Sequence, residues 1–470
     1  MGLQIHRTVE HRPESRIDEA MGVLKQRFGD RLSTSESVRE QHGKGEDHHP
    51  VVPPDGVFFA ESTEEVAEAV KICAEYKMPV IPFGTGTSLE GHVAALHGGL
   101  TIDLTRMDAV LEVNAEDLDC RVQPGVTRKQ LNEYLRDTGL FFPIDPGADA
   151  SIGGMTATRA SGTNAVRYGT MRENVLGLTV VTADGRIVKT AQRARKSSAG
   201  YDLTRLFVGS EGTLGVITEI TLRLYGIPES IVSALCAYPS LEAAVNTVIE
   251  TIQLGVPVSR IEIADEVQMK ATNDYSGTDL PVAPMLWFEF HGTEAGTTEQ
   301  AEMVKAISDE WGGGDFQWTA SAEERAKLWQ ARHDAAYAAK NIRKGAEVWA
   351  TDVCVPISRL AECIVETQND IRENNLIAPI VGHVGDGNFH LVLIADQDDA
   401  DEMARANAVN ERLVHRAIAM EGTCTGEHGI GMGKMDFLIA EHGEAVSLMR
   451  LIKKALDPEN IMNPGKILRV

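Results

Sequence analysis

Hydrophobic and polar positions in the first half of the chain follow helical and strand spacings in turn. Residues 64–76 place Val66, Val70, Cys73 and Tyr76 on one face of a predicted helix. The short apolar stretches MPVIPF and GLTIDL, which come next, predict two strands. A glycine-rich segment, GTGTSLEG, separates these strands. This succession of helices and short strands indicates α/β or α+β architecture.

Two further segments carry their own boundary signals. In the predicted helix 126–139, Thr127 and Gln130 have the spacing of a capping box, and Gly139 marks the end. In the segment 178–190, an Asp-Gly pair between two β-rich runs predicts a hairpin.

The pattern changes after residues 224–230, where glycine becomes sparse. Strand-like runs such as IVSALCA and MLWFEF then alternate with helical runs such as LEAAVNTVIETIQLG. We therefore predict a second domain, with an antiparallel sheet and helices on one face. The predicted ranges are a helical lead-in over 1–49, a first domain over 50–227, a second domain over 228–421 and a C-terminal segment over 422–470.

Length and composition are those of a globular protein. The 470 residues suffice for two or three domains, and no apolar run is long enough to cross a bilayer. The first residues, MGLQIHRTVEHRPESR, lack the apolar core of a secretory signal and mix Glu with Arg, unlike a mitochondrial transit peptide. We therefore expect a cytoplasmic protein without a transmembrane segment, and contact with a membrane face remains open.

The net charge of −24 limits the classes of partner that the protein can bind. A field of this sign repels nucleic acid, so we expect no nucleic-acid partner. It also repels an anionic substrate, which would need cations placed locally. The six cysteines include no C-x-x-C pair, which argues against a disulfide framework or a cysteine zinc site.

The glycine-rich segment GTGTSLEG resembles a dinucleotide-binding loop at first sight. Gly84 and Gly86 fit the Rossmann fingerprint, but Leu89 stands at its third glycine position and a strand follows instead of a helix. The loop can still offer backbone amides and hydroxyls to a pyrophosphate, or it is a plain connection between strands. Three further glycine-rich segments between residues 147 and 215 favour a large phosphate-bearing cofactor.

Two histidines flank a predicted hairpin in VGHVGDGNFH, residues 381–390. The Asp386-Gly387 pair is a strong two-residue turn signal. Pairing outward from that turn places His383 directly opposite His390, with Cβ atoms about 5 Å apart. Two imidazoles at that distance are close enough to bind one metal ion, although two ligands alone do not make a metal site.

A second glycine-rich loop, GTCTGEHGIGMGK, supplies candidates for a third ligand. Glu427 would complete a set of two histidines and one carboxylate that keeps positions open for substrate. His428 would then stay unligated and serve as a base. The alternative is a flexible loop with a solvated Glu-His pair, and spacing alone leaves both interpretations open.

An arginine in the predicted helix 324–340 is a candidate anion ligand. Trp329, Arg332, His333 and Ala336 have spacings that place them on one helix face. Most arginines are solvated, but Arg332 shares its face with a tryptophan that we expect to be buried. An inward-pointing arginine in an acidic protein is a plausible partner for a substrate carboxylate.

These segments together resemble a known family. Four of them resemble the FAD-binding domain of the vanillyl-alcohol oxidase type: PFGTGTSLEGH, PGADASIGGM, SGTNAVRYGT and GSEGTLGVIT. Others are similar to the FAD-linked D-2-hydroxyacid dehydrogenases, closest to the cytochrome-linked D-lactate branch: LWQARH, TDVCVPISRL, GHVGDGNFH, GTCTGEHGIG and LDPENIMNPGKIL. They occur in the right order and cover nearly the whole chain beyond residue 50.

The resemblance implies an α+β fold. Its parts are a vanillyl-alcohol oxidase-type FAD domain and an antiparallel, ferredoxin-like cap domain with helices on one face. The C-terminal segment is expected to pack back on the FAD domain. The implied FAD-binding positions are Pro82, Gly84, Thr85, Gly86, Thr87, Ser88, Pro146, Gly147, Asp149, Ser151, Gly153, Gly154, Thr156, Asn164, Tyr168, Gly169, Glu211, Gly212, Gly215, Ile217 and Asn463.

The resemblance also implies a chemistry. His383, His390 and Glu427 match the ligands of a divalent metal, which this ligand set leaves open as Zn²⁺, Mn²⁺ or Fe²⁺. His428 matches the base that takes the hydroxyl proton while hydride passes to flavin N5. Arg332 matches the arginine that binds the substrate carboxylate.

The expected reaction is oxidation of a D-2-hydroxyacid to the 2-oxoacid, most of all D-lactate to pyruvate. Relatives that take D-2-hydroxyglutarate tend to carry a lysine just before the D-x-x-x-P segment, where this chain has Trp349, Ala350 and Thr351. A glycolate or D-2-hydroxyglutarate enzyme is the alternative within the family. The expected electron acceptor is a quinone, cytochrome c, an electron-transfer flavoprotein or oxygen.

Two readings from other classes are weaker. A metal-dependent hydrolase would use the His/Glu motifs but leave four glycine-rich segments unexplained. A non-enzymatic flavin- or nucleotide-binding module would give the His/Glu cluster no task.

Overall fold

The computed structural model describes the backbone of residues 14–470. The first thirteen positions of the predicted lead-in lie outside the described residues. The chain forms two compact units: a first unit of residues 14–161, 169–226 and 427–470, and a second unit of residues 162–168 and 227–426. The predicted ranges did not foresee that 162–168 groups with the second unit, and they placed the C-terminal division five residues earlier, at 421/422.

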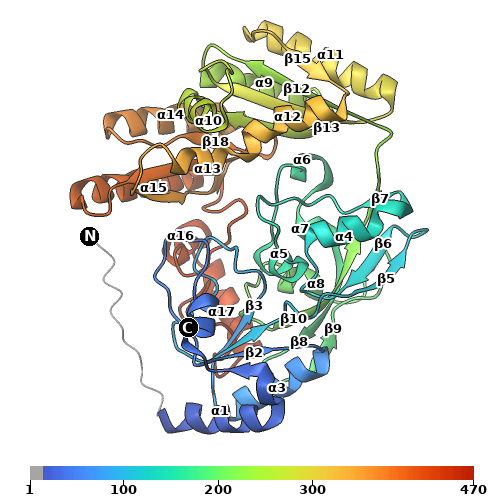
Figure 1. Ribbon diagram of the computed structural model, residues 1–470, viewed down its shortest axis with the longest axis vertical. Helices are drawn as coiled ribbons and strands as arrows, with labels where there is room; N and C mark the ends of the chain where they lie inside the picture. The colour runs from blue at the N-terminus through green and yellow to red at the C-terminus, as the bar shows by residue number, and fades with distance from the viewer. Residues whose placement is uncertain (1–13) are drawn as a thin grey trace. The chain divides into compact units, whose positions relative to one another are not determined.

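The first unit begins with helices and a small mixed sheet (Figure 1). Its strand order is β1-β2-β4-β3, with β2, β4 and β3 parallel and β1 antiparallel at the edge. The predicted apolar face of α3 packs into the core, where Val66, Val70 and Cys73 are fully buried. The elements are α1 (Glu14–Phe28), η1 (Gly29–Arg31), β1 (Leu32–Ser33), α2 (Glu36–His42), β2 (Gly56–Phe59), α3 (Thr63–Glu75), β3 (Val80–Phe83) and β4 (Leu100–Asp103).

A five-stranded antiparallel sheet, β5-β6-β10-β8-β9, forms the rest of the first unit's core. The capping box predicted at the start of α4 is present, with Thr127 and Gln130 each bonded to the other's backbone. The elements are β5 (Val110–Asn114), β6 (Asp119–Val122), α4 (Arg128–Leu135), η2 (Arg136–Thr138), β7 (Leu140–Phe141), α5 (Ile152–Thr158), α7 (Met171–Asn174), β8 (Val175–Val181), β9 (Ile187–Lys189), α8 (Leu203–Phe207), β10 (Val216–Arg223), β11 (Tyr225–Gly226), α16 (Met435–His442) and α17 (Ala445–Leu456).

The C-terminal tail of the first unit is tied to the glycine-rich segments. The backbone of Met462 pairs with Val80, the first residue of β3. Lys453 Nζ, in α17, donates to the carbonyls of Thr213 and Met462, each at 2.8 Å. These bonds fasten the tail to β3 and to the turn before β10.

Lys466, in the same tail, gives a pH-dependent prediction. Its Nζ donates to Ala94 O at 2.7 Å, and burial lowers the pKa of the lysine to about 7 although Glu211 and Asp47 oppose the shift. Between pH 7 and about 10.5 the unfolded chain binds more protons there than the native chain, so native stability rises with pH. Replacing Lys466 by Met removes this contribution, which amounts to at most about 1.4 kcal/mol per pH unit.

Urea unfolding of both proteins at pH 7 to 10 tests the Lys466 prediction. We expect the stability of the wild type, relative to the Met variant, to increase as the pH rises. Parallel stability profiles for the two proteins would contradict a lowered pKa.

The second unit is built on one antiparallel sheet (Figure 1), ordered β15-β12-β14-β13-β18-β19-β16, with β17 beside β19. Its first four strands have the ferredoxin-like order, and α9 and α11 pack on the sheet face of Ala234, Cys236 and Phe288. The elements are α6 (Ala165–Tyr168), β12 (Ser230–Ala237), α9 (Leu241–Gln253), β13 (Val258–Ala264), α10 (Glu266–Ser276), β14 (Met285–Gly292), α11 (Glu294–Glu310), β15 (Gln317–Thr319), α12 (Ala322–His333), α13 (Ala335–Lys340), β16 (Glu347–Ala350), β17 (Val353–Cys354), η3 (Ile357–Arg359), α14 (Leu360–Glu373), β18 (Ile380–Gly382), η4 (Val384–Asp386), β19 (Asn388–Ala395) and α15 (Ala400–Ala419).

Helices also cover the other face of this sheet, whereas the sequence predicted helices on one face only. Met269 of α10, Trp329 of α12 and Ala339 of α13 pack there against Trp287 and Leu235. The sequence predicted one helix over 324–340, whereas the structure ends α12 at His333 and begins α13 after Asp334.

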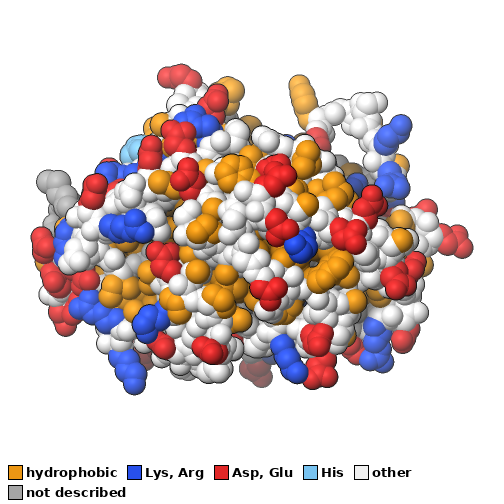
Figure 2. Space-filling view, turned by 90° about the horizontal axis from the view of Figure 1, so that it is seen from above, with side chains coloured by type: hydrophobic (Ala, Val, Ile, Leu, Met, Phe, Trp, Pro, Cys, Tyr) orange, Lys and Arg blue, Asp and Glu red, His pale blue; other side chains and the backbone are white. Residues whose placement is uncertain are grey.

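The surface agrees with a globular protein of mixed charge. Figure 2 shows acidic and basic side chains interspersed over the face in view. None of the described helices combines the length and hydropathy needed to cross a bilayer.

Candidate functional site

The histidine hairpin forms, but in a register that differs from the prediction. His390 lies opposite Val381 instead of His383, because the turn is a 3₁₀ segment, η4, and not a two-residue turn. Gly387 ends this segment at a φ of 82°, and a Cβ there would lie 2.1 Å from Val355 O. The two rings are still neighbours, with centroids 5.7 Å apart and planes at 82°.

The second unit fixes the tautomer of both histidines. His390 Nδ1 lies 2.8 Å from the backbone carbonyl of Thr351, which can only accept. His383 Nδ1 lies 2.7 Å from Glu262 Oε1. Both Nδ1 atoms therefore carry a hydrogen, and in the neutral rings Nε2 is the nitrogen with a lone pair. This is the arrangement that metal-binding histidines usually show.

Arg332 points inward, as its helix face predicted. Its side chain is only 14% exposed, and Nη2 lies 2.6 Å from Glu262 Oε2. Glu262 itself is fully buried. Burial would raise the pKa of this carboxyl, but His383 and Arg332 outweigh it and lower the pKa, so the group is ionised.

A second buried carboxylate, Asp352, organises the strands beside His390. It accepts from Asn388 Nδ2 at 2.8 Å and from Thr425 Oγ1 at 2.6 Å. A Cβ on Gly426 would lie 2.3 Å from Asn388 Nδ2, so the chain passes directly over this network. Gly426 is the last residue of the second unit before the predicted ligand Glu427.

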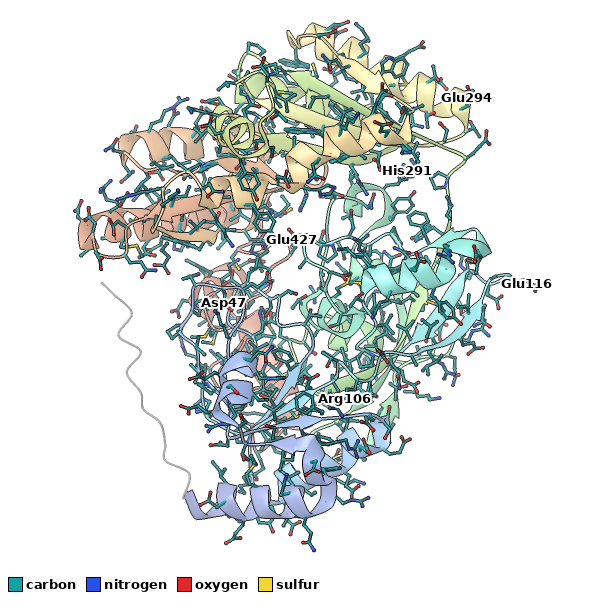
Figure 3. All side chains as sticks on the ribbon, viewed as in Figure 1. Asp47, Arg106, Glu116, His291, Glu294 and Glu427 are labelled. Carbon is teal, nitrogen blue, oxygen red and sulfur yellow. The ribbon has the colours of Figure 1, made fainter. Side chains whose placement is uncertain are left out.

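Glu427 (labelled in Figure 3) and His428 open the part of the first unit that returns after residue 426. Their proposed roles with the histidine pair stay predictions. Buried carboxylates set the path of their loop. Glu211 accepts from the backbone amides of Ile430 and Gly431 at 2.7 and 2.8 Å. Glu90 pairs with Lys434 at 2.9 Å; burial raises its pKa, but Lys434 and His49 outweigh this and lower it.

The glycine-rich segments of the first unit converge. A Cβ on Gly84 would lie 2.3 Å from Ser151 Oγ, and Ser151 N donates to Thr85 Oγ1 at 3.4 Å. A Cβ on Gly212 would lie 2.9 Å from Pro82. Segments far apart in sequence therefore meet at the end of β3, and a side chain at Gly84 or Gly212 would crowd the segment that it meets.

The loop after β3 fits a phosphate-bearing cofactor. Within the described chain, the backbone amides of residues 85–88 donate to no protein acceptor, and the buried hydroxyl of Ser88 has no protein partner. Gly86 has a φ of 72°, which favours glycine. A row of unused donors is what a pyrophosphate requires.

The other implied FAD positions divide into two groups. Asn164 and Tyr168 lie in the second unit: Asn164 Oδ1 accepts from Arg260 Nε at 3.0 Å, and the Tyr168 hydroxyl lies 2.7 Å from Nδ1 of His291, which Figure 3 labels. The rest lie in the first unit, in the loop before α5, in α5 itself, before α7, around the turn into β10 and in the tail: Pro146, Gly147, Asp149, Gly153, Gly154, Thr156, Gly169, Gly215, Ile217 and Asn463.

The structure reveals two site residues that the sequence analysis did not assign to the site. Glu262 stands in the apolar strand segment VSRIEIA, and Asp352 follows the apolar strand β16. A carboxylate within a buried strand is rare unless it is paired. That signal was available in the sequence, although the partners were not.

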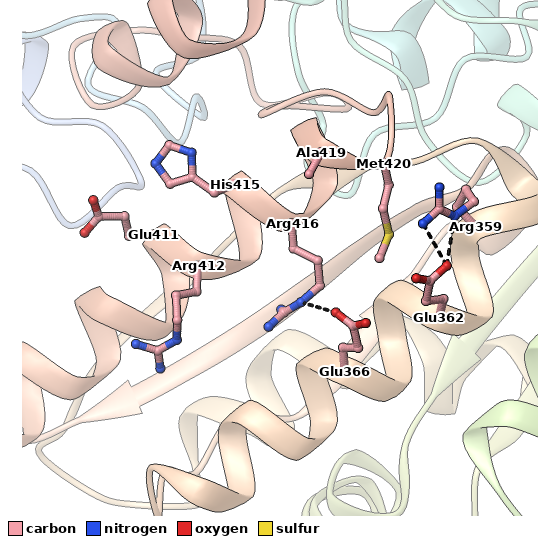
Figure 4. Close-up of a pocket in the computed structure, with 9 residues that line it drawn as sticks. All are labelled: Arg359, Glu362, Glu366, Glu411, Arg412, His415, Arg416, Ala419 and Met420. Atoms are coloured by element: carbon pink, nitrogen blue, oxygen red, sulfur yellow. Dashed lines mark hydrogen bonds and ion pairs between the residues drawn. The ribbon is translucent and has the colours of Figure 1, made fainter.

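A shallow groove between α14 and α15 is a weaker candidate (Figure 4). Each of its three arginines is ion-paired: Arg359 with Glu362 at 2.8 Å, Arg412 with Asp370 at 2.6 Å, and Arg416 with Glu366 at 3.0 Å. The groove is the weaker candidate because, among the described residues, no group of side chains that could hold a metal ion lines it.

Family models cover most of the chain. Residues 54–191 match the FAD binding domain, and residues 227–467 match the C-terminal domain of FAD linked oxidases. The solved structure of p-cresol methylhydroxylase matches with a TM-score of 0.79 at 18% identity, over 97% of each chain. A 4-ethylphenol oxidase from Gulosibacter chungangensis matches with a TM-score of 0.78 at 18% identity, over 97% of this chain and 98% of that one. At this identity these two structures support the predicted fold alone.

Curated relatives are closer in sequence. A protein of Danio rerio named probable D-lactate dehydrogenase, mitochondrial, is 54% identical over 97% of this chain and 92% of its own length. The D-lactate dehydrogenase (cytochrome), mitochondrial, of Arabidopsis thaliana is 49% identical over 96% of this chain and 80% of its own. The glycolate oxidase subunit GlcD of Bacillus subtilis is 35% identical, over 88% and 89%.

Proposed function

This chain belongs to the FAD-linked oxidases, and from that premise we propose that it oxidises a D-2-hydroxyacid to the 2-oxoacid, with D-lactate and pyruvate as the pair. The observation that carries the substrate class is the inward-pointing Arg332 on the same buried carboxylate as His383. This arrangement supports the proposal, because an arginine that could bind a carboxylate and a candidate metal ligand both contact Glu262.

Each proposed site residue has its own role in the reaction. Arg332 binds the substrate carboxylate and thereby orients the α-carbon. His383 and His390 would hold a divalent ion through their Nε2 atoms, with Glu427 as the third ligand that the family resemblance implies. When bound, such an ion lowers the pKa of a coordinated hydroxyl. His428 accepts the hydroxyl proton on its imidazole.

Bound FAD supplies the acceptor for the two electrons and the α-hydrogen that leave the substrate. The loop after β3, with its unused amides and the buried Ser88 hydroxyl, would hold the phosphate groups of the cofactor. A cytochrome is the proposed final acceptor, because relatives at 41–49% identity carry cytochrome in their names. The cytoplasmic location stays a prediction.

The absence of a lysine at 349–351 favours a monocarboxylate over a dicarboxylate. Trp349 is buried. The Thr351 carbonyl accepts from His390 Nδ1, and the Thr351 hydroxyl oxygen accepts from Leu391 N. This segment therefore brings no second cation. Glycolate is the second candidate substrate, because GlcD subunits are among the relatives.

Anaerobic reduction of the flavin tests the proposal. The purified, FAD-loaded protein should lose its yellow colour with D-lactate and retain it with L-lactate. Comparing kcat/KM for D-lactate, glycolate and D-2-hydroxyglutarate then ranks the acids. A correctly folded protein that takes up no FAD, or that no hydroxyacid reduces, would refute the proposed function.

A further inference from the structure

We propose that Glu262 is a positioning residue that holds the carboxylate-binding arginine and one metal-binding histidine with its two oxygens at the same time. The inference rests on the proposed function, since it assigns Glu262 to that same site. Glu262 itself touches neither substrate nor metal in this role. It sets where Arg332 and His383 point.

The geometry gives each oxygen of Glu262 one task. Oε1 lies 2.7 Å from His383 Nδ1, and Oε2 lies 2.6 Å from Arg332 Nη2. The carboxylate is fully buried, while the side chains of His383 and Arg332 are each 14% exposed. The two functional groups therefore reach outward from a common buried anchor.

Backbone pairing holds this anchor in place. Glu262 lies in β13 opposite Trp287 of β14, and its neighbour Ile263 pairs with Gly382 of β18, the residue before His383. Trp329 of α12 packs against Trp287 in the core on this side of the sheet. Sheet and core thus fix the carboxylate before any ligand binds, which is how precise sites are supported.

Only an ionised carboxylate satisfies both partners. Arg332 can only donate, and His383 must donate from Nδ1 if Nε2 is to keep its lone pair. A glutamine at 262 offers one acceptor oxygen and one NH₂ group. If that NH₂ group faces His383, the ring hydrogen must move to Nε2, the nitrogen proposed to bind the metal. If the NH₂ group faces Arg332, two donors oppose each other and the arginine must turn away.

The charge of Glu262 also balances the site. Arg332 and Glu262 form a largely buried pair, and removing one member of such a pair leaves the other charge uncompensated. With the carboxylate in place, Arg332 stays in position without a substrate. We therefore expect Glu262 to affect both metal affinity and substrate affinity, a combination that a general packing role would not produce.

The test compares Glu262→Gln with Glu289→Gln. Glu289 is a matched control, because it lies on the same sheet face and binds its own histidine, His291, at 2.8 Å. It is also 5% exposed and so tests the cost of neutralising a buried glutamate. For both variants we would measure Mn²⁺ affinity by competition with a chelator, KM and kcat for D-lactate, FAD content and melting temperature.

We expect Glu262→Gln to weaken Mn²⁺ binding by about 10- to 100-fold, the effect typical of removing the partner of a metal-binding histidine. KM for D-lactate should rise by at least about 10-fold, and FAD content should not change. Glu289→Gln should keep the Mn²⁺ affinity of the wild type. A folded Glu262→Gln protein with wild-type Mn²⁺ affinity and KM would overturn the inference.

A second variant covers the case in which Glu262→Gln fails to fold. Glu262→Asp keeps the charge but withdraws it by one methylene, so it should fold and still bind Mn²⁺ and D-lactate more weakly than the wild type. Wild-type values for that variant would also overturn the inference. If the wild type itself binds no Mn²⁺ and is not reduced by D-lactate, the proposed function fails instead, which separates the two failures.

Discussion

Replacing His428 by Ala is expected to slow anaerobic flavin reduction by D-lactate about 10²- to 10⁴-fold, while FAD stays bound. The expected loss follows from removing the group proposed to accept the hydroxyl proton. The loop itself should keep its path, because Glu211 holds it through the backbone amides of Ile430 and Gly431 and not through the imidazole. Stopped-flow absorbance of the flavin measures the rate.

The matched control for this variant is His442→Ala. His442 ends α16 in the same unit and its side chain is 41% exposed, so its loss should leave the reduction rate unchanged. A His428→Ala enzyme that is reduced at nearly the wild-type rate would show that another group takes the proton. A protein that loses FAD along with activity would point to a structural role for the loop.

Replacing His390 by Ala is expected to abolish metal binding and to lower kcat by about 10³-fold. The physical reason is that a metal ion contributes several kcal/mol to charge stabilisation, and each decade of rate corresponds to about 1.36 kcal/mol. Of the two histidines, His390 gives the stricter test. Its Nδ1 donates to the backbone carbonyl of Thr351, so only its Nε2 is left to bind a metal. Elemental analysis of the purified variant and steady-state kinetics measure the two effects.

Removing the metal with a chelator is a second, independent test of the predicted metal site. EDTA should suppress wild-type activity and added Mn²⁺ or Zn²⁺ should restore it, whereas the His390→Ala enzyme should respond to neither. An enzyme indifferent to EDTA, with no metal found by elemental analysis, would refute the metal site while leaving the flavin chemistry in place.

Local pattern was enough to predict most elements of the fold. The apolar face of α3 and the capping box of α4 depend on residues within a few positions of one another, and both are present as predicted. The ferredoxin-like order of β12 to β15 followed from the family resemblance and is confirmed. The division of the helix at Asp334 was missed, because helical spacing continues across it and nothing in the local sequence marks the break.

The sequence by itself determined which chemical groups this protein has: two histidines beside one turn, an arginine on a tryptophan face, and a set of glycine-rich loops. The tertiary structure decided how these groups are held. The turn took a 3₁₀ form in which Gly387 passes close to Val355. The register there differs by two residues from the predicted one, yet the two rings stay together. Glu262 and His383 are 121 residues apart in the chain, and no local pattern could pair them. The sheet and the core set pairings of this kind, because a buried charge without a partner costs free energy.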